Sequence, residues 1–222
     1  PILAPPDPSS GGLPEGPLDF PPPAEPSNPA PESAPQQGDA PSEGATPESA
    51  VPLPTGEPSY TGVAGFPGAN QHPIDLVDDF VRGISWWEKN NRPCTMLILG
   101  VADASNQRSA KLGCDLYQGK DANVRLDGPD HLIGRLEVCN NKKSNRRLKG
   151  IRVVGDRVNP DGSTEFIPTA DSDEHPNCAT WSRSVLCPVG EYATGLVVHA
   201  NDATNTVEEI TGLQLICRRA AQ

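Results

Sequence analysis

The sequence predicts an all-β fold: one small disulfide-stapled β domain with an internal repeat, preceded by an extended proline-rich arm. Three observations predict it. Of the 26 prolines, 18 lie within residues 1–58. All six cysteines lie after that segment. Short apolar stretches, separated by turn-forming residues, fill the second half of the chain, which is typical of β proteins.

The arm comprises residues 1–58, with nine acidic residues and no Lys or Arg. Proline fixes φ, donates no backbone hydrogen bond and keeps the preceding residue out of the helical region. We therefore expect an extended segment that is polyproline II or disordered. The formal net charge is −11, so only −2 remains on the rest of the chain. Steps such as Ala34-Pro35 and Thr46-Pro47 resemble those of hydroxyproline-rich extracellular matrix glycoproteins, which implies hydroxylation and O-glycosylation.

The next segments are a hinge and the body of the protein. Residues 59–73 are glycine-rich and predict a hinge. Residues 74–222 form the predicted β domain. Apolar positions between Asp75 and Ile84 fit a short amphipathic helix with Asp75 as its N-cap, and a strand remains the alternative.

Strands of similar length then follow one another, with turn formers such as Asn159-Pro160-Asp161-Gly162 between them. The predicted strands are 95–100, 124–126, 131–138, 148–154, 164–167, 192–199 and 210–217.

Two of these stretches resemble each other, residues 130–155 and residues 191–217. Each is a strand, a polar loop and a second strand. Gly134 and Gly150 in the first copy correspond to Gly195 and Gly212 in the second, which one inserted residue aligns. A repeated hairpin predicts a pseudo-symmetric β fold in which each unit buries its apolar face against the others.

A family resemblance follows from the second copy. Trp181-Ser182, Cys187-Pro188-x-Gly190 and Ile210-x-Gly212-Leu213-x-Leu215-x-Cys217 resemble a repeat of the vitelline membrane outer layer protein I family. That resemblance implies a three-fold β-prism and a role in an extracellular layer. Only two repeats are clear, and a third would have to involve Trp87 and the stretch from Cys94 to Cys114. The fold is therefore expected to be a β-prism or a sandwich.

The cysteines are even in number, widely spaced and free of Cys-x-x-Cys pairs. Zinc sites usually need close pairs of ligands, so we expect disulfides and an oxidising, extracellular location. The sequence does not choose among the pairings. The six residues are Cys94, Cys114, Cys139, Cys178, Cys187 and Cys217.

Basic residues concentrate in the first repeat. We expect them to receive an acidic partner, either the arm or an acidic polysaccharide. Nucleic acid is not expected, because the body is not basic overall and the cysteines indicate an extracellular protein. The predicted residues are Arg135, Lys142, Lys143, Arg146, Arg147, Lys149 and Arg152.

Aromatic residues offer a second kind of contact. Trp86, Trp87 and Trp181 are candidates for a carbohydrate platform or a polyproline groove, or alternatively for the core. Because neighbouring side chains of an extended segment face opposite ways, one of Trp86 and Trp87 is expected to be exposed.

The sequence contains no recognisable catalytic, metal or membrane-spanning motif. Neither Gly-x-Ser-x-Gly nor His-Glu-x-x-His occurs. Asp171-Ser-Asp173-Glu174-His175 lacks the glycine and ligand spacing of an EF-hand loop, and an acidic solvated loop is the preferred interpretation. No apolar stretch is long enough for a membrane span, and no signal peptide is recognisable. We expect no enzyme activity, no cofactor and no metal.

Two functional hypotheses follow. The first is a self-assembling subunit of an extracellular layer or filament, a homo-oligomer or polymer in which the arm of one molecule docks on the β domain of the next. The alternative is a carbohydrate-binding, lectin-like module on a proline-rich stalk.

Overall fold

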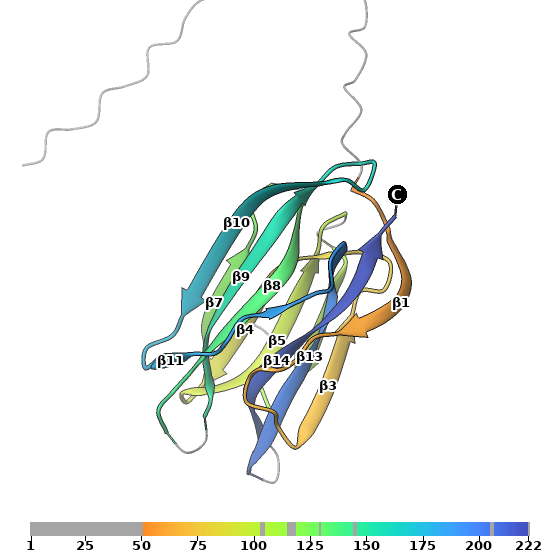
Figure 1. The fold of residues 1–222 in the computed structure, drawn as a ribbon. Coiled ribbons are helices and arrows are strands. Elements are labelled where there is room, and N and C mark those ends of the chain that lie inside the picture. Colours follow the sequence, from red (N-terminus) through yellow and green to blue (C-terminus); the bar gives the residue numbers. More distant parts are fainter. Residues whose placement is uncertain are drawn as a thin grey trace, which may run out of the picture. The chain divides into compact units, whose positions relative to one another are not determined.

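The computed structural model describes residues 51–102, 105–114, 119–128, 130–143, 146–204 and 207–221. In these residues every regular element is a β-strand, and the strands form three antiparallel sheets (Figure 1). No helix in this part of the chain is long and apolar enough to cross a membrane. The predicted arm lies outside the described residues from Pro1 to residue 50.

Each sheet is built on one central hairpin. The hairpins are β4 (Val81–Lys89) with β5 (Arg92–Gly100), β8 (His131–Asn140) with β9 (Leu148–Val158), and β13 (Glu191–Thr204) with β14 (Val207–Ala220). The second and third hairpins are the two predicted repeats, residues 130–155 and 191–217. The first hairpin is the third unit that the sequence left open.

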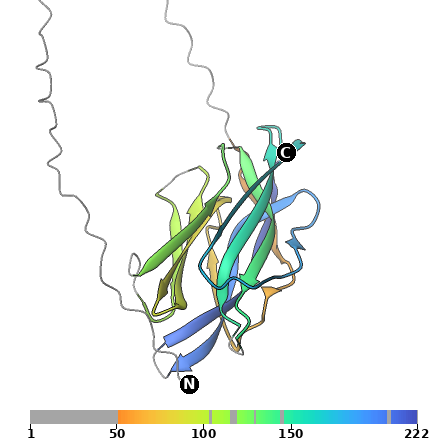
Figure 2. The same ribbon diagram turned by 90° about the vertical axis from the view of Figure 1, so that its left-hand side faces the viewer.

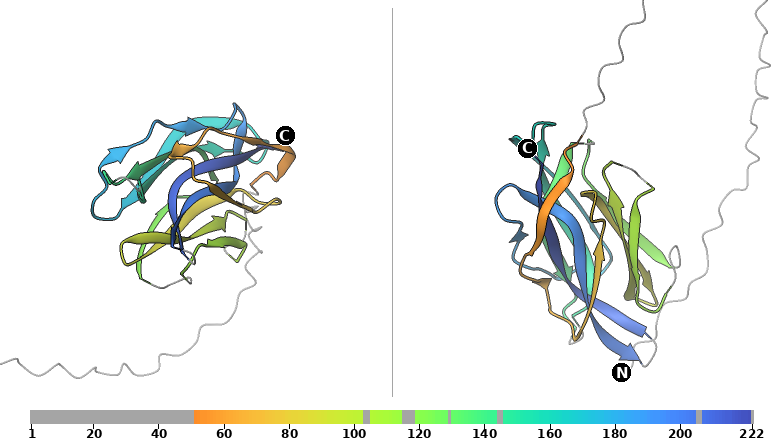
Figure 3. Two further views of the ribbon diagram at one scale, coloured as in Figure 1. Left: turned by 90° about the horizontal axis from the view of Figure 1, so that it is seen from below. Right: turned by 90° about the vertical axis from the view of Figure 1, so that its right-hand side faces the viewer.

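Outer strands flank the hairpins in the same order each time. β6 (Gln107–Lys111) pairs with β5, and β7 (Lys120–Arg125) pairs with β4. β10 (Thr164–Glu174) pairs with β9, while β11 (Thr180–Trp181) and β12 (Val185–Leu186) pair with β8. Figures 2 and 3 show the three sheets around a common interior.

The outer strands of the third sheet come from the beginning of the described residues, before the first hairpin. β1 (Pro54–Tyr60) and β2 (Ala64–Gly65) pair with β14, and β3 (Asn70–Asp75) pairs with β13. The hinge predicted over residues 59–73 is therefore wrong, and the arm predicted to end at residue 58 runs into β1. Gly65 contributes to this misinterpretation, because a glycine-rich segment is read as a hinge. Here glycine is needed within a paired strand: its φ is +84°, and a Cβ at this position would lie 2.7 Å from the carbonyl oxygen of Thr211.

The three hairpins share one register. Each has two β-bulges separated by five paired positions, and the β13–β14 hairpin has a third register shift closer to its tip. The paired stretches run from Gly83 to Trp87, from Arg135 to Cys139 and from Gly195 to His199 on the first strands. Gly195 therefore corresponds to Arg135 and not to Gly134. The second copy carries two inserted residues rather than one. Both lie between Ala200 and Ile210, a stretch in which β13 and β14 continue to pair.

The sheets pack their inner faces into one apolar core. Ile84, Ile98, Ile151 and Leu213, among others, are fully buried in it. Burial of each such side chain contributes about 1.5–3 kcal/mol. The predicted alternation in the second strands of both repeats is therefore confirmed, since these residues face the interior.

The helix predicted from Asp75 is wrong. Residues 76–80 form a turn, in which Val77 has a φ of +65° and its N–H donates to Asp75 Oδ1 at 3.1 Å. Asp79 is buried and accepts hydrogen bonds from the backbone of Phe80 and Val101. The alternative prediction of a strand is correct from Val81 onward, where β4 begins. Both faces of β4 are largely buried, so its apolar residues do not show the simple alternation of a half-exposed strand.

All six cysteines pair. The disulfides are Cys94–Cys114, Cys139–Cys178 and Cys187–Cys217. The first two tie a hairpin strand to a segment of its own sheet. The third joins the segment after β12 to β14 and so links two sheets. Three such bonds are typical of proteins that fold in the oxidising secretory pathway.

Candidate functional site

An open groove of about 760 Å³ lies along the seam between the β8–β9 sheet and the β13–β14 sheet. Three segments line it: the β2 region, the loop between β8 and β9, and the stretch from β11 to β12. The lining residues are Val63, Gly65, Phe66, Asn140, Asn141, Lys142, Lys143, Arg146, Thr180, Trp181, Ser182, Arg183 and Val185.

The groove exists because the edge strands at this seam are short. β2, β11 and β12 have two residues each, so the two sheets meet through irregular chain. The seam between β7 and β10 is different, because both strands are longer and side chains join them. Asp173 and Asp171 accept hydrogen bonds from the backbone N–H groups of Asn123 and Arg125, at 2.9 and 2.8 Å. The acidic segment predicted as a solvated loop thus belongs to β10 and seals that seam.

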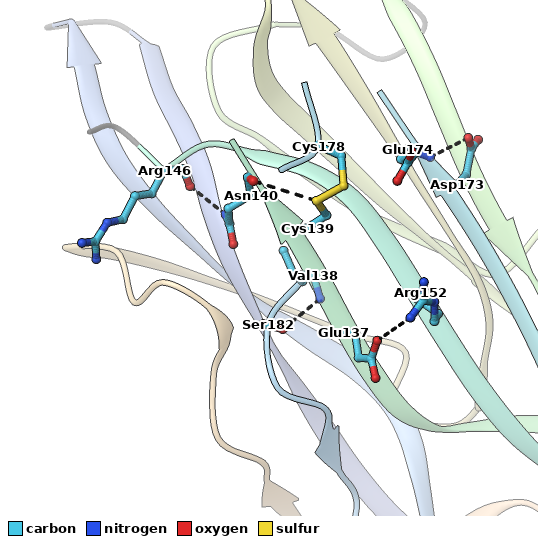
Figure 4. The surroundings of a disulfide bond; sticks show 10 residues. All are labelled: Glu137, Val138, Cys139, Asn140, Arg146, Arg152, Asp173, Glu174, Cys178 and Ser182. Atoms are coloured by element: carbon cyan, nitrogen blue, oxygen red, sulfur yellow. Dashed lines mark hydrogen bonds and ion pairs between the residues drawn. A yellow bond between two sulfur atoms is a disulfide. The ribbon is translucent and has the colours of Figure 1, made fainter. Parts of the chain in front are cut away.

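The loop between β8 and β9 is held firmly against its neighbours. Asn140 Nδ2 donates to the carbonyl of Arg146 at 2.7 Å (Figure 4). It also donates to the carbonyl of Thr211, on β14, at 2.8 Å. The N–H of Asn141 donates to the Arg147 carbonyl at 3.0 Å, and its Oδ1 accepts from the Arg147 N–H at 3.1 Å. These bonds fix the direction in which the exposed residues Lys142, Lys143 and Arg146 leave the loop.

Two aromatic rings from different segments line the groove, and each is in contact with an arginine. The guanidinium carbon of Arg146 lies 4.0 Å from the centre of the Phe66 ring. That of Arg152 lies 4.4 Å from the centre of the Trp181 ring. Arg152 also donates to Glu137 at 2.9 Å, as Figure 4 shows. Both rings are half-buried, so part of each faces the groove.

The groove is positively charged. Lys142, Lys143, Arg146 and Arg183 line it, and no Asp or Glu is among the lining residues. Of the seven predicted basic residues, the structure brings three to this groove. Arg152 reaches its edge through Trp181, while exposed Arg135 lines a different hollow of about 500 Å³ beside Glu191 and Tyr192.

The remaining two predicted basic residues do not face a partner outside the molecule. Lys149 is fully buried, with its Nζ 2.5 Å from Glu88 Oε1 and 2.8 Å from Asn91 Oδ1. Arg147 makes a bidentate pair with Glu209, which also faces Arg92. For these two residues the prediction of acidic-partner binding is wrong, because buried charge needs a partner within the fold.

Trp86 and Trp87 are also unavailable. Trp86 is fully buried in the core, where its ring meets His175 edge to face at 5.8 Å. Trp87 faces the opposite side of β4 but is only 5 % exposed. The alternation that the sequence predicted is present, and the predicted exposure is wrong because both faces of β4 are covered. Trp181 alone of the three lies in the groove.

Sequence reasoning missed Phe66, Asn140 and Arg183. Phe66 fell within the supposed hinge, and Arg183 stands alone next to Trp181-Ser182. The Trp181-Ser182 pair was the only sequence motif that pointed to this segment. In the structure Ser182 holds the segment against β8: its N–H donates to the Val138 carbonyl at 2.8 Å, and its Oγ accepts from the Val138 N–H at 3.1 Å.

Two histidines are buried away from the groove. His175 is 4 % exposed and His199 is 3 % exposed. Burial in the fold lowers the pKa of each imidazole below its usual value. Both therefore stay neutral in the folded chain at a pH at which exposed histidines take up protons.

We expect the stability to fall as the pH drops from 7.5 to 5.5. Below about pH 6.5 the unfolded chain binds protons at His175 and His199 that the folded chain does not, so protons favour unfolding. The free energy of unfolding decreases by at most about 1.4 kcal/mol per pH unit for each histidine. Urea unfolding across this range measures it, and the His175→Gln variant should show a shallower slope. A stability that rises as the pH falls contradicts the assignment.

Several solved structures resemble this chain, among them three lectins. The Calsepa lectin, in complex with a biantennary N-glycan, has a TM-score of 0.51 and 14% identity over 74% of this chain and 99% of the lectin. The agglutinin of Calystegia sepium has a TM-score of 0.50 and 14% identity with the same coverage. A mannose-specific jacalin-related lectin from Morus nigra, in complex with mannose, has a TM-score of 0.45 and 10% identity over 74% and 96% of the two chains.

The first two likenesses show the fold, which is a three-sheet β-prism like that of these lectins. The predicted β-prism is confirmed, and the sandwich alternative is wrong. Neither a protein-family model nor a curated protein sequence matches the chain. Of the resemblance to the vitelline membrane outer layer protein I family, the comparisons support the β-prism fold that it implied, and they do not show the family itself.

Proposed function

We propose that the protein is an extracellular glycan-binding module that takes its ligand in the groove between β2, the β8–β9 loop and the β11–β12 segment. The observation that carries this proposal is the lining of the groove. Sugars bind in concave sites where an aromatic ring supports the apolar face of the ring and a few fixed polar groups receive the hydroxyls. Trp181 and Phe66 provide the aromatic surface, and Lys142, Lys143 and Arg183 provide donors.

The fold supports the same conclusion by analogy, since the Calsepa lectin and the agglutinin of Calystegia sepium share it and the former was solved with a glycan bound. The three disulfides suit an extracellular location. Binding is favoured over catalysis because the two buried histidines do not line the groove.

We expect Trp181→Ala to weaken glycan binding by about 30-fold, which corresponds to the roughly 2 kcal/mol that a central aromatic contributes to an interface. Binding of the full chain to a glycan array identifies the ligand, and titration calorimetry with that ligand gives the ratio. Tyr60→Ala is the matched control, because Tyr60 is 57 % exposed on β1 and does not line the groove. Equal losses in both variants, or no glycan bound by the parent chain, would count against the proposal.

The other hypothesis, self-assembly through the arm, depends on residues outside the described part of the chain. The groove, whose lining includes cations and no Asp or Glu, is complementary in charge to the acidic arm of residues 1–58. Self-assembly can be tested by sedimentation. An unchanged sedimentation coefficient over a hundredfold range of protein concentration argues against it.

A further inference from the structure

The basic loop between β8 and β9 borders two hollows. Besides the groove, a second hollow of about 440 Å³ is lined by Asn91, Asn141, Lys142, Lys143, Asn177, Cys178 and Ala179. Asn141 and the two lysines line both. The two hollows therefore adjoin at this loop and form one track, which we call the basic track, from Phe66 and Trp181 in the groove to Asn91 and Asn177 in the second hollow.

The basic track has no acidic lining at either end. Neither hollow includes an Asp or Glu, although the whole chain has a formal net charge of −11. Carboxylates are close by, because Glu88 and Glu209 lie at the tips of the neighbouring hairpins. Both of these are buried, and both are paired with basic residues that point into the fold.

The cations of this region are thus of two kinds. Arg147 and Lys149 point inward and are neutralised by Glu209 and Glu88. Lys142, Lys143 and Arg183 point outward, and within the described residues no carboxylate lies within ion-pair distance of them. Like charges gathered in one track repel one another, and an anion bound among them relieves that repulsion.

The neutral lining residues also bear on the ligand. Trp181 and Phe66 offer apolar ring surface at one end of the basic track, and amide side chains of Asn91 and Asn177 line the other end. This combination suits a polymer that carries hydroxyls and apolar ring faces as well as negative charge. Lysine and arginine bind carboxylate and sulfate groups through charge-assisted hydrogen bonds.

We propose that the ligand of the basic track is a linear anionic glycan, with carboxylate or sulfate groups that bind Lys142, Lys143 and Arg183. This inference rests on the proposed function and narrows it from glycans in general to acidic ones. A chain of several sugars crosses the tip of the β8–β9 hairpin, so binding strengthens with the length of the oligosaccharide.

Calorimetry on the full chain tests the proposal with four probes: a sulfated disaccharide, a sulfated hexasaccharide, a neutral hexasaccharide of mannose and polyglutamate. A uronate hexasaccharide in a parallel titration separates carboxylate from sulfate. We expect the anionic hexasaccharide to bind at least tenfold more tightly than the disaccharide and the neutral probe. Its affinity should fall as salt is raised, because salt screens exposed charges.

The decisive variant is Lys142→Ala/Lys143→Ala, which should weaken binding of the anionic hexasaccharide about tenfold or more. Arg135→Ala is the matched control, since Arg135 is an exposed cation on β8 outside the basic track. The three lysine and arginine positions are exposed, so the variants are expected to fold, and thermal unfolding checks this.

The outcomes separate the two proposals. Equal binding of neutral and anionic hexasaccharides, unchanged by the double lysine variant, overturns the anionic ligand and leaves a glycan-binding module. Absence of binding to every saccharide overturns both. Polyglutamate binding as tightly as the anionic hexasaccharide overturns the glycan ligand, because the basic track then recognises charge alone.

Discussion

A chain that lacks residues 1–75 should not fold, whereas a chain that lacks only residues 1–50 should fold as the full chain does. The longer deletion removes β1, β2 and β3, which supply both outer edges of the β13–β14 hairpin. It also removes Ala64 and Ile74 from the core. Each lost hydrogen bond contributes about 0.5–1.5 kcal/mol and each buried apolar side chain about 1.5–3 kcal/mol. Their total exceeds the roughly 5–15 kcal/mol of net stability that a domain has.

Near-ultraviolet circular dichroism and thermal unfolding measure the result for the two truncated chains. The hinge interpretation of residues 59–73 makes the opposite prediction, because a domain that begins at residue 74 would fold alone. A cooperative transition in the chain of residues 76–222 would therefore support the hinge. The chain of residues 51–222 is the control, and its failure to fold would show that residues 1–50 contribute to stability.

The hairpins were predictable from the sequence where their side chains repeat. Ile151 and Val153 in β9 match Leu213 and Leu215 in β14, because all four face the core from equivalent positions. The β4–β5 hairpin could not be recognised as a copy from its sequence. Its backbone has the same two bulges, but Thr95 stands where the other copies have Gly150 and Gly212. The register is set by the hydrogen bonds between the backbones of the two strands, so hairpins with different side chains can share it.

The site was predictable only in part, for a related reason. Lys142 and Lys149 look alike in a basic stretch, yet one is exposed and the other fully buried. Lys149 is the bulged residue of β9 and points into the interior, whereas Lys142 lies in the loop before that strand. A bulge leaves no mark in the composition of the stretch. Phe66 and Arg183 meet in the groove because β2 and the β11–β12 segment lie at one seam, which only the strand order determines.

The same bulge position carries the largest expected effect of a single substitution. Lys149, Cys94 and Thr211 occupy equivalent bulge positions in the three hairpins. Cys94 is in a disulfide, and Thr211 donates to the carbonyl of Phe66 at 3.0 Å. Lys149 instead places a charge in the interior, where Glu88 of β4 is its partner. This pair joins two sheets, so we expect its loss to lower the stability of the whole domain.

We expect Lys149→Met to lower the free energy of unfolding by about 3–5 kcal/mol, because the carboxylate of Glu88 is then buried without a cation. The double variant Lys149→Met/Glu88→Met should recover most of that loss. Replacing both members of a buried ion pair by apolar side chains of similar size is often neutral or stabilising. Urea unfolding followed by tryptophan fluorescence, with the disulfides intact, gives both values.

The comparison between the two variants carries the argument even if the single variant does not fold. A double variant that is as unstable as the single one would mean that Lys149 acts by filling space, or by its contact with Asn91 at 2.8 Å, and not by neutralising Glu88. A single variant that loses less than 1 kcal/mol would mean that water reaches this pair. Arg152→Met is the control, because its pair with Glu137 is partly exposed and such pairs contribute only about 0–1 kcal/mol.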